Sequence, residues 1–151
     1  MITPVAEVGF VPWTWVDAQL QAARTIWLGT TRRDGRPHAV PVWFVWDGRT
    51  LYFLTDRRGQ KAKNLGHQAG VVMHLADGDH ATILHGRASV VGDPAEKSQV
   101  DFAYGLKYVD PKTGARAGVN GSDDVLFRVD VRHVMTWAYG DVASRTDWRL
   151  Q

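Results

Sequence analysis

The sequence contains no cysteine among its 151 residues. Disulfide bonds, thiolate nucleophiles and cysteine-based zinc sites are therefore excluded. No apolar run approaches the roughly 20 residues that a membrane-spanning helix needs, so we expect no membrane partner. The first nine residues have neither a basic segment nor a long apolar run, and we expect no secretion signal and a cytoplasmic location.

An excess of charge of one sign is also missing, because 18 Lys and Arg face 16 Asp and Glu, for a formal net charge of +2. Nucleic-acid-binding domains usually carry a dominant cationic face, so we expect no nucleic-acid partner. The sequence has neither a G-x-S-x-G nucleophile motif nor a G-x-G-x-x-G dinucleotide fingerprint. No side chain is assigned as catalytic, and the chemistry would have to come from a bound cofactor.

Aromatic residues are plentiful, with seven Trp, and hydrophobic residues make up 44% of the chain. A chain of this length and composition is typical of one globular domain, which we assign to residues 1–151. Large aromatics at this density either fill a barrel or line a site for a planar ligand.

Short apolar segments separated by Asp-Gly turns and similar signals indicate an antiparallel meander. The predicted strands are 25–31, 36–46, 51–55, 70–76, 80–91 and 125–138, and the predicted helices are 12–23, 60–65 and one starting after Asp93. We expect Thr14 to cap the first helix, the 38–46 segment to be buried on both faces, Gly86 to mark a bulge, and 110–124 to be an exposed, mobile loop. The fold class is α+β, mainly β, with about six or seven strands closing or nearly closing a barrel.

A basic cluster follows the strand that ends at Thr55. Four cations, Arg57, Arg58, Lys61 and Lys63, lie within seven residues. Lys61 near a helix start, where backbone N–H groups are unpaired, is an arrangement that attracts phosphate. Thr55 would add a hydroxyl donor. The alternative is a solvated basic turn with no ligand.

Six histidines are present, and three of them, His74, His80 and His85, fall within twelve residues. Their spacing matches no zinc pattern, so we expect no metal site. Trp148 lies near the C-terminus between charged neighbours, where packing onto a neighbouring chain or a ligand is expected.

These pieces together resemble a known family. The run TIWLGTTRRDGRPHAVPVWFVWDGRTLYFLTDRRGQKAKNL, followed by GVVMHL, ILHGRASVV and the C-terminal WAYGD and TDWRL, is similar to the split β-barrel flavin and deazaflavin oxidoreductases. That superfamily is related to pyridoxamine 5′-phosphate oxidase, and the nearest resemblance is to the branch that uses coenzyme F420. The resemblance covers roughly residues 25–91 and 125–150, most of the chain.

The resemblance implies a six- to seven-stranded antiparallel split β-barrel that forms a homodimer, with cofactor sites at the subunit interface. It places the cofactor phosphate near Lys61, and the cofactor ring along the strand 40–43, and it assigns a further contribution to the partner subunit. The implied cofactor-binding residues are Val40, Pro41, Val42, Trp43, Thr55, Arg57, Gln60, Lys61, Asn64, Met73, His74 and Trp148. Two positions depart from the family pattern, Gly59 in place of a common serine and Asp147 in place of a common arginine, and both predict weaker cofactor binding.

The function implied is an F420-dependent reductase that transfers a hydride to a small conjugated substrate. Arg32, Arg33 and Arg36 would then face the polyglutamate tail of F420, or would be surface charge. Tyr104, Tyr108 or His74 could donate a proton. The alternatives are an FMN-binding oxidoreductase, or a non-catalytic flavin or haem carrier with His74 or His85 as the haem ligand.

Overall fold

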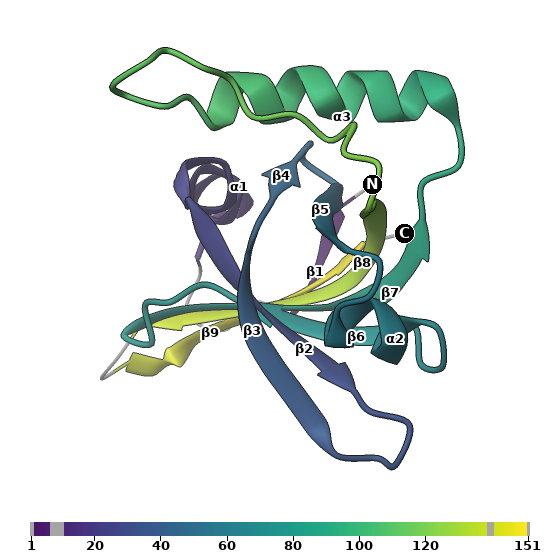
Figure 1. Cartoon of the computed structure of the whole chain (residues 1–151). Helices are drawn as coiled ribbons and strands as arrows, with labels where there is room; N and C mark the ends of the chain where they lie inside the picture. The colour runs from purple at the N-terminus through teal and green to yellow at the C-terminus, as the bar shows by residue number, and fades with distance from the viewer. Residues whose placement is uncertain (1, 7–10, 139–140, 151) are drawn as a thin grey trace.

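The computed structural model describes residues 2–6, 11–138 and 141–150. These residues form nine strands and three helices (Figure 1). The strands are β1 (Ile2–Ala6), β2 (Thr25–Thr31), β3 (Pro37–Trp43), β4 (Val45–Trp46), β5 (Thr50–Asp56), β6 (Gly70–His74), β7 (His80–Val90), β8 (Asp124–Ala138) and β9 (Asp141–Leu150). The helices are α1 (Trp13–Ala22), α2 (Gln60–Leu65) and α3 (Pro94–Lys107).

The strands pair antiparallel and curl around one another in a split barrel, as predicted (Figure 1). The pairs run from β3 through β2, β6, β7 and β8 to β5, which pairs with β4. Because β3 continues through Phe44 directly into β4, the path returns to its start. The strands β1 and β9, which the sequence interpretation did not separate as strands, extend the sheet beyond β8.

Turn chemistry sets the hairpins that the sequence predicted. Gly35 and Gly48 have φ of +86° and +94°, which glycine adopts without a steric penalty. The Asp47 carboxylate accepts hydrogen bonds from the backbone N–H groups of Arg49 at 2.9 Å and Thr50 at 2.6 Å. These contacts fix the β4–β5 turn.

The main core fills the barrel with apolar side chains from β2, β5, β6, β7 and β8, among them Ile26, Phe53 and Met73. The helix α1 covers one end of this core by burying Val16 and Leu20 in it. The predicted Thr14 cap is wrong, because the helix begins after Pro12 without a side-chain cap.

A second apolar cluster lies between α3 and the outer side of β4 and β5, and it includes Tyr52, Tyr104 and Tyr108. Asp93 caps α3 by accepting a hydrogen bond from the Ala95 N–H, as predicted. The following segment is not an exposed loop throughout. Val119 is 1% exposed, and its N–H donates to Asp101 Oδ1 at 2.8 Å, which ties the segment to α3.

The prediction that residues 38–46 are buried on both faces is wrong. Exposure alternates along β3, and Trp43 at its end is 42% exposed. The strand stops there because Phe44 turns into the barrel core, and the segment then continues as β4, in which Val45 and Trp46 pair with β5.

The predicted bulge at Gly86 is confirmed, because the β7–β8 register shifts between His85 and Gly86. No helix in the described ranges is long and apolar enough to cross a membrane. Tyr139 and Gly140 of the WAYGD motif lie outside the described residues.

Candidate functional site

A cavity of about 400 Å³ lies where β3, β5 and α2 meet the segment after α3. Its lining comes from six parts of the chain that the barrel brings together. The lining residues are Pro41, Val42, Trp43, Leu54, Thr55, Asp56, Lys61, Tyr104, Ala117, Gly118 and Asp124. Five of them, namely Pro41, Val42, Trp43, Thr55 and Lys61, belong to the set implied by the family resemblance.

Charge in this cavity is mixed. Lys61 is half-buried and is the cation in the lining, which also includes two acidic residues, Asp56 and Asp124. The Asp56 carboxylate accepts the Arg58 backbone N–H at 2.7 Å, which lowers its pKa. An anion bound here would therefore depend on Lys61 for its charge partner, with the Thr55 hydroxyl beside it.

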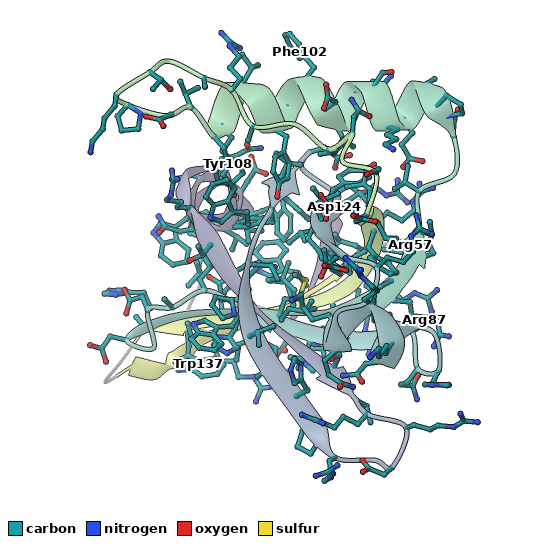
Figure 2. The ribbon with its side chains drawn as sticks, in the orientation of Figure 1. Arg57, Arg87, Phe102, Tyr108, Asp124 and Trp137 are labelled. Carbon is teal, nitrogen blue, oxygen red and sulfur yellow. The ribbon has the colours of Figure 1, made fainter. Side chains whose placement is uncertain are left out.

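The other cations of the basic cluster do not line the cavity. Arg58 is paired with Asp56 at 3.6 Å and with Asp123 at 3.9 Å. Arg57 is exposed, and its backbone N–H donates to the carbonyl of Asp123 at 2.9 Å. Figure 2 shows Arg57 near Asp124, and Lys63 is exposed on α2.

Gln60 and Asn64 form a polar link behind Lys61. The Asn64 side chain is buried, accepts from Gln60 Nε2 at 2.7 Å and donates to Thr30 Oγ1 at 2.9 Å. Asn64 thus joins α2 to β2. Gln60 also lines a different cavity of about 460 Å³, together with Arg32, Asp34 and the remaining arginines of the 32–36 turn.

Val40 lies on β3 next to the cavity but outside its lining, paired with Leu28. The residues that the family resemblance assigns to the partner subunit's contribution, Met73, His74 and Trp148, do not line this cavity. Met73 is fully buried in the barrel, and Trp148 is 4% exposed and meets Trp13 edge-on at 5.3 Å. His74 stacks on Trp27 on the outer face of the sheet, with ring centres 6.3 Å apart.

The unusual Asp147 does not project an unpaired charge. Its carboxylate lies 3.1 Å from His133 Nε2 and 3.1 Å from Arg145 Nε. This pairing reduces the effect that the departure from arginine was predicted to have on a nearby anion.

A second cavity, of about 520 Å³, adjoins the first and shares Trp43 and Ala117 with it. The sequence interpretation missed this cavity, because its cations come from distant parts of the chain. It is lined by Arg24, Trp43, Tyr108, Val109, Asp110, Pro111, Lys112, Ala115, Arg116 and Ala117. Figure 2 shows Tyr108 and Asp124, which line the second and first cavities respectively, below α3.

The candidate proton donors differ in their surroundings. Tyr104 lines the first cavity, and burial raises the pKa of its phenol, so the hydroxyl keeps its proton at neutral pH. The Tyr108 hydroxyl is already engaged by three backbone groups, since it accepts from Phe44 N–H at 2.8 Å and lies 2.7 and 2.8 Å from the carbonyl oxygens of Arg24 and Phe44. His74 lies outside both cavities, with Nδ1 2.9 Å from the carbonyl of Leu75.

Within the part of the chain that the structure describes, no three His, Asp or Glu side chains gather as a metal site would require. The arrangement therefore offers an anion contact, the backbone of β3 and a buried phenol around one cavity. Such a site can hold a phosphorylated, partly planar ligand.

The fold and this cavity define a class of protein. Residues 15–138 match the family described as pyridoxamine 5′-phosphate oxidase, and the chain belongs to that family. A curated relative, the F420H(2)-dependent biliverdin reductase of Mycobacterium tuberculosis (strain CDC 1551 / Oshkosh), is 32% identical over 111 residues, which are 67% of this chain and 81% of the relative.

Solved structures agree on the fold. The conserved hypothetical protein Rv2991 from Mycobacterium tuberculosis superposes with a TM-score of 0.73 at 24% identity, covering 93% of this chain and 92% of that one. A structure described as an F420 reductase has a TM-score of 0.58 at 27% identity, covering 76% of this chain and 91% of that one. The split-barrel oxidoreductase family indicated by the sequence is thus confirmed.

Proposed function

We propose that this protein is a coenzyme F420-dependent reductase acting on a small conjugated organic molecule. The observation that carries this proposal is the first cavity, whose lining contains Lys61 and Thr55 together with the β3 segment Pro41–Trp43. The similarity to an F420H(2)-dependent reductase supports deazaflavin over other phosphorylated cofactors. When bound in its reduced form, the cofactor would supply a hydride to an electron-poor carbon of the substrate.

The chain's own residues would bind and orient the cofactor. Lys61 would contact the phosphate by a charge-assisted hydrogen bond, with Thr55 as a second donor. Pro41, Val42 and Trp43 would lie along the ring, and Tyr104 would hold a proton for the reduced substrate. Of the other implied residues, Gln60 and the arginines of the 32–36 turn would face the cofactor tail in the neighbouring cavity, and Asn64 would position Gln60.

We further propose a homodimer that places each cofactor site at the subunit boundary. Residues that pair across six strands form a continuous row on the outer face of the sheet, running Pro41, Trp27, His74, Ile83, Met135 and Asp147. Paired residues point to the same side, so this row is opposite to the barrel core. Pro41 belongs both to this face and to the cavity lining, which links the two.

A second copy packed on this face would bring its own His74 row close to the cavity. The roles proposed for Met73 and Trp148 are then to support this face from behind, since both side chains are buried in the barrel. Val40 and Arg57 would have peripheral contacts. The cytoplasmic location and the assignment of residues 1–151 to one domain stay predictions.

The test is a titration of the cofactor-free protein with F420 and, separately, with FMN, followed by tryptophan fluorescence. We expect F420 to bind at micromolar concentration or tighter and FMN to bind at least tenfold more weakly (about 1.4 kcal/mol). A preference for FMN would replace the proposal with a flavin enzyme or carrier. Binding of neither would remove the proposed cofactor site.

A matched pair of variants tests the phosphate contact. Lys61→Ala should weaken F420 binding about tenfold or more, because a charge-assisted hydrogen bond is lost. Lys63→Ala, on the same helix but exposed and outside the cavity, should leave the affinity unchanged. Equal effects of both variants would assign the phosphate elsewhere.

A further inference from the structure

The second cavity, whose lining includes Arg24, Trp43, Tyr108, Lys112 and Arg116, is separate from Lys61, the residue proposed to contact the cofactor phosphate. We propose that it binds the carboxylate end of a planar, conjugated substrate. The role of this ligand as a substrate rests on the proposed reductase function, but its binding can be tested without any cofactor.

The aromatic part of the site is a stacked pair. The rings of Trp43 and Tyr108 lie 4.4 Å apart at an interplanar angle of 4°. Tyr108 is almost completely buried and covers one side of the indole, while Trp43 keeps 42% of its surface exposed. A planar ligand stacks favourably on an aromatic surface of this kind.

The stack is held rigidly before any ligand arrives. The Tyr108 hydroxyl contacts backbone groups of Arg24 and Phe44, which lie at the ends of two separate strands. The Arg24 guanidinium in turn lies 4.9 Å from the Trp43 ring centre and 5.4 Å from that of Tyr108. A surface fixed in this way loses little conformational entropy on binding.

The charge of the cavity favours an anion. Three cations, Arg24, Lys112 and Arg116, line it together with one carboxylate, Asp110. Asp110 accepts the backbone N–H groups of Lys112 at 2.7 Å and Thr113 at 3.2 Å, and these bonds lower its pKa and keep it in the turn.

Within the part of the chain that the structure describes, none of the three cations is neutralised by a carboxylate. Among the described residues, no carboxylate lies within 4.0 Å of a charged nitrogen of Arg24, Lys112 or Arg116. Guanidinium groups bind carboxylates by paired, charge-assisted hydrogen bonds, so a carboxylate-bearing ligand supplies the missing partner.

The second cavity lies next to the proposed cofactor site, so a carboxylate bound there could hold a substrate beside the cofactor. The cavity shares Trp43 and Ala117 with the proposed cofactor site, and its volume of about 520 Å³ suits a small organic molecule. A ligand anchored by Arg24 and Arg116 would extend its conjugated part over Trp43 toward the β3 segment along which the cofactor ring is proposed to lie. The site would thereby favour substrates that are planar, through Trp43, and anionic, through Arg24 and Arg116.

The test compares 2-naphthoate with neutral 2-naphthamide by calorimetric titration of the cofactor-free protein. These probes share a ring and differ in charge. We expect the carboxylate to bind about tenfold or more tightly than the amide, because the amide cannot form a charge-assisted pair. Arg24→Gln and Arg116→Gln should each weaken naphthoate binding severalfold and leave naphthamide unchanged. Arg36→Gln, which lies in a different cavity, should change neither affinity.

Two further arms separate this inference from the proposed function. Arg24→Gln and Arg116→Gln should bind F420 as the unaltered protein does, and saturating F420 should not displace naphthoate. Displacement of naphthoate by F420 would assign these cations to the carboxylates of the cofactor tail and overturn the inference. Equal affinities for naphthoate and naphthamide would also overturn it. Charge-selective naphthoate binding in a protein that fails to bind F420 would support this site and reject the cofactor.

Discussion

The ammonium group of Lys107 lies 3.8 Å from the ring centre of Phe44. Lys107 is at the end of α3, and Phe44 is the residue at which β3 turns into the core. The ammonium nitrogen is buried without a hydrogen-bond partner among the described residues. The cation–π contact offsets only part of the lost hydration, so burial lowers the pKa of Lys107 from 10.5 to about 8.

Replacing this lysine should make the protein more stable at neutral pH. Below pH 8 the buried ammonium is charged and its desolvation opposes folding. As the pH rises from about 8 to 10.5, the folded state loses the proton before the unfolded state does, so the stability of the unaltered protein should increase. Lys107→Met should raise the free energy of unfolding at pH 7 by about 1–2 kcal/mol, measured by urea denaturation, and this gain should shrink as the pH approaches 10.

A control variant separates the effect of Lys107 on stability from the effects of other titrating groups. Burial and a hydrogen bond to Glu96 raise the pKa of Tyr52 to about 12, which by itself lowers stability above pH 10 in every variant. Lys63→Met, at an exposed lysine of α2, should show no gain at pH 7. A Lys107→Met protein that is less stable than the parent at pH 7 would show that the Phe44 contact outweighs desolvation.

A polar contact between the helix α1 and the barrel can be tested separately. Trp46 Nε1 donates a hydrogen bond to Asp17 Oδ1 at 2.7 Å. Asp17→Ala should lower the free energy of unfolding by about 1–3 kcal/mol, because the buried indole N–H loses its acceptor. Asp17→Asn keeps an acceptor and should cost less. Gln21→Ala, exposed on the same helix, should be nearly neutral in the same denaturation experiment. A loss as large as that of Asp17→Ala would show that the effect is not specific to the contact with Trp46.

The sequence predicted the parts of the fold that depend on local signals. Asp47 with Gly48, and Asp93 with Pro94, act on residues only a few positions away, so their turn and cap could be recognised directly. The prediction that residues 38–46 are buried on both faces fails because the side chains of this segment divide between two surfaces. Val42 and Phe44 enter the core, whereas Trp43 faces the cavities.

The site was harder to predict because it depends on pairing across the chain. The sequence singled out Lys61 among the four cations of the basic cluster but could not show what the others contact. Asp56 and Asp123 engage Arg58, and Lys61 is the member of the cluster that lines the first cavity. The family resemblance implied both Lys61 and the β3 residues 41–43, and the structure places them in the lining of one cavity. Arg24 and Arg116 are far apart in the sequence and line one cavity in the fold, where the Tyr108 hydroxyl contacts the backbone of Arg24, and no local pattern near either residue indicated this.

At the Gly86 bulge, we expect the single methyl group added by an alanine substitution to lower the stability of the protein strongly. A Cβ atom added at Gly86 would lie 2.5 Å from the backbone oxygen of Asp130 and 2.8 Å from a methyl of Val129. Because a backbone atom cannot move aside cheaply, Gly86→Ala should lower the free energy of unfolding by about 2 kcal/mol or more. Gly78→Ala has nothing within 4 Å and should change stability little in the same measurement. Equal thermal midpoints for the two variants would mean that β7 and β8 can separate at the bulge.

The outer face of the sheet leads to a prediction about assembly. Val72 on β6 is 38% exposed and pairs with Gly29 and His85, in the row next to that of Trp27 and His74. If this face packs against a second copy, Val72→Asp would place two carboxylates in an apolar interface, where unpaired charge is strongly unfavourable.

We therefore expect the parent protein to sediment as a dimer and Val72→Asp to sediment as a monomer, measured by analytical ultracentrifugation at micromolar concentration. Val90→Asp is the matched control, because Val90 is 60% exposed and lies at the C-terminal end of β7, where it pairs with Phe127. Val72 pairs instead with His85, in the middle of β7. It should remain dimeric. Since Pro41 lies both on the outer face and in the cavity lining, the Val72→Asp monomer should also lose F420 affinity while Val90→Asp keeps it. A folded Val72→Asp dimer, or a monomeric parent that binds F420 normally, would place the cofactor site within a single subunit.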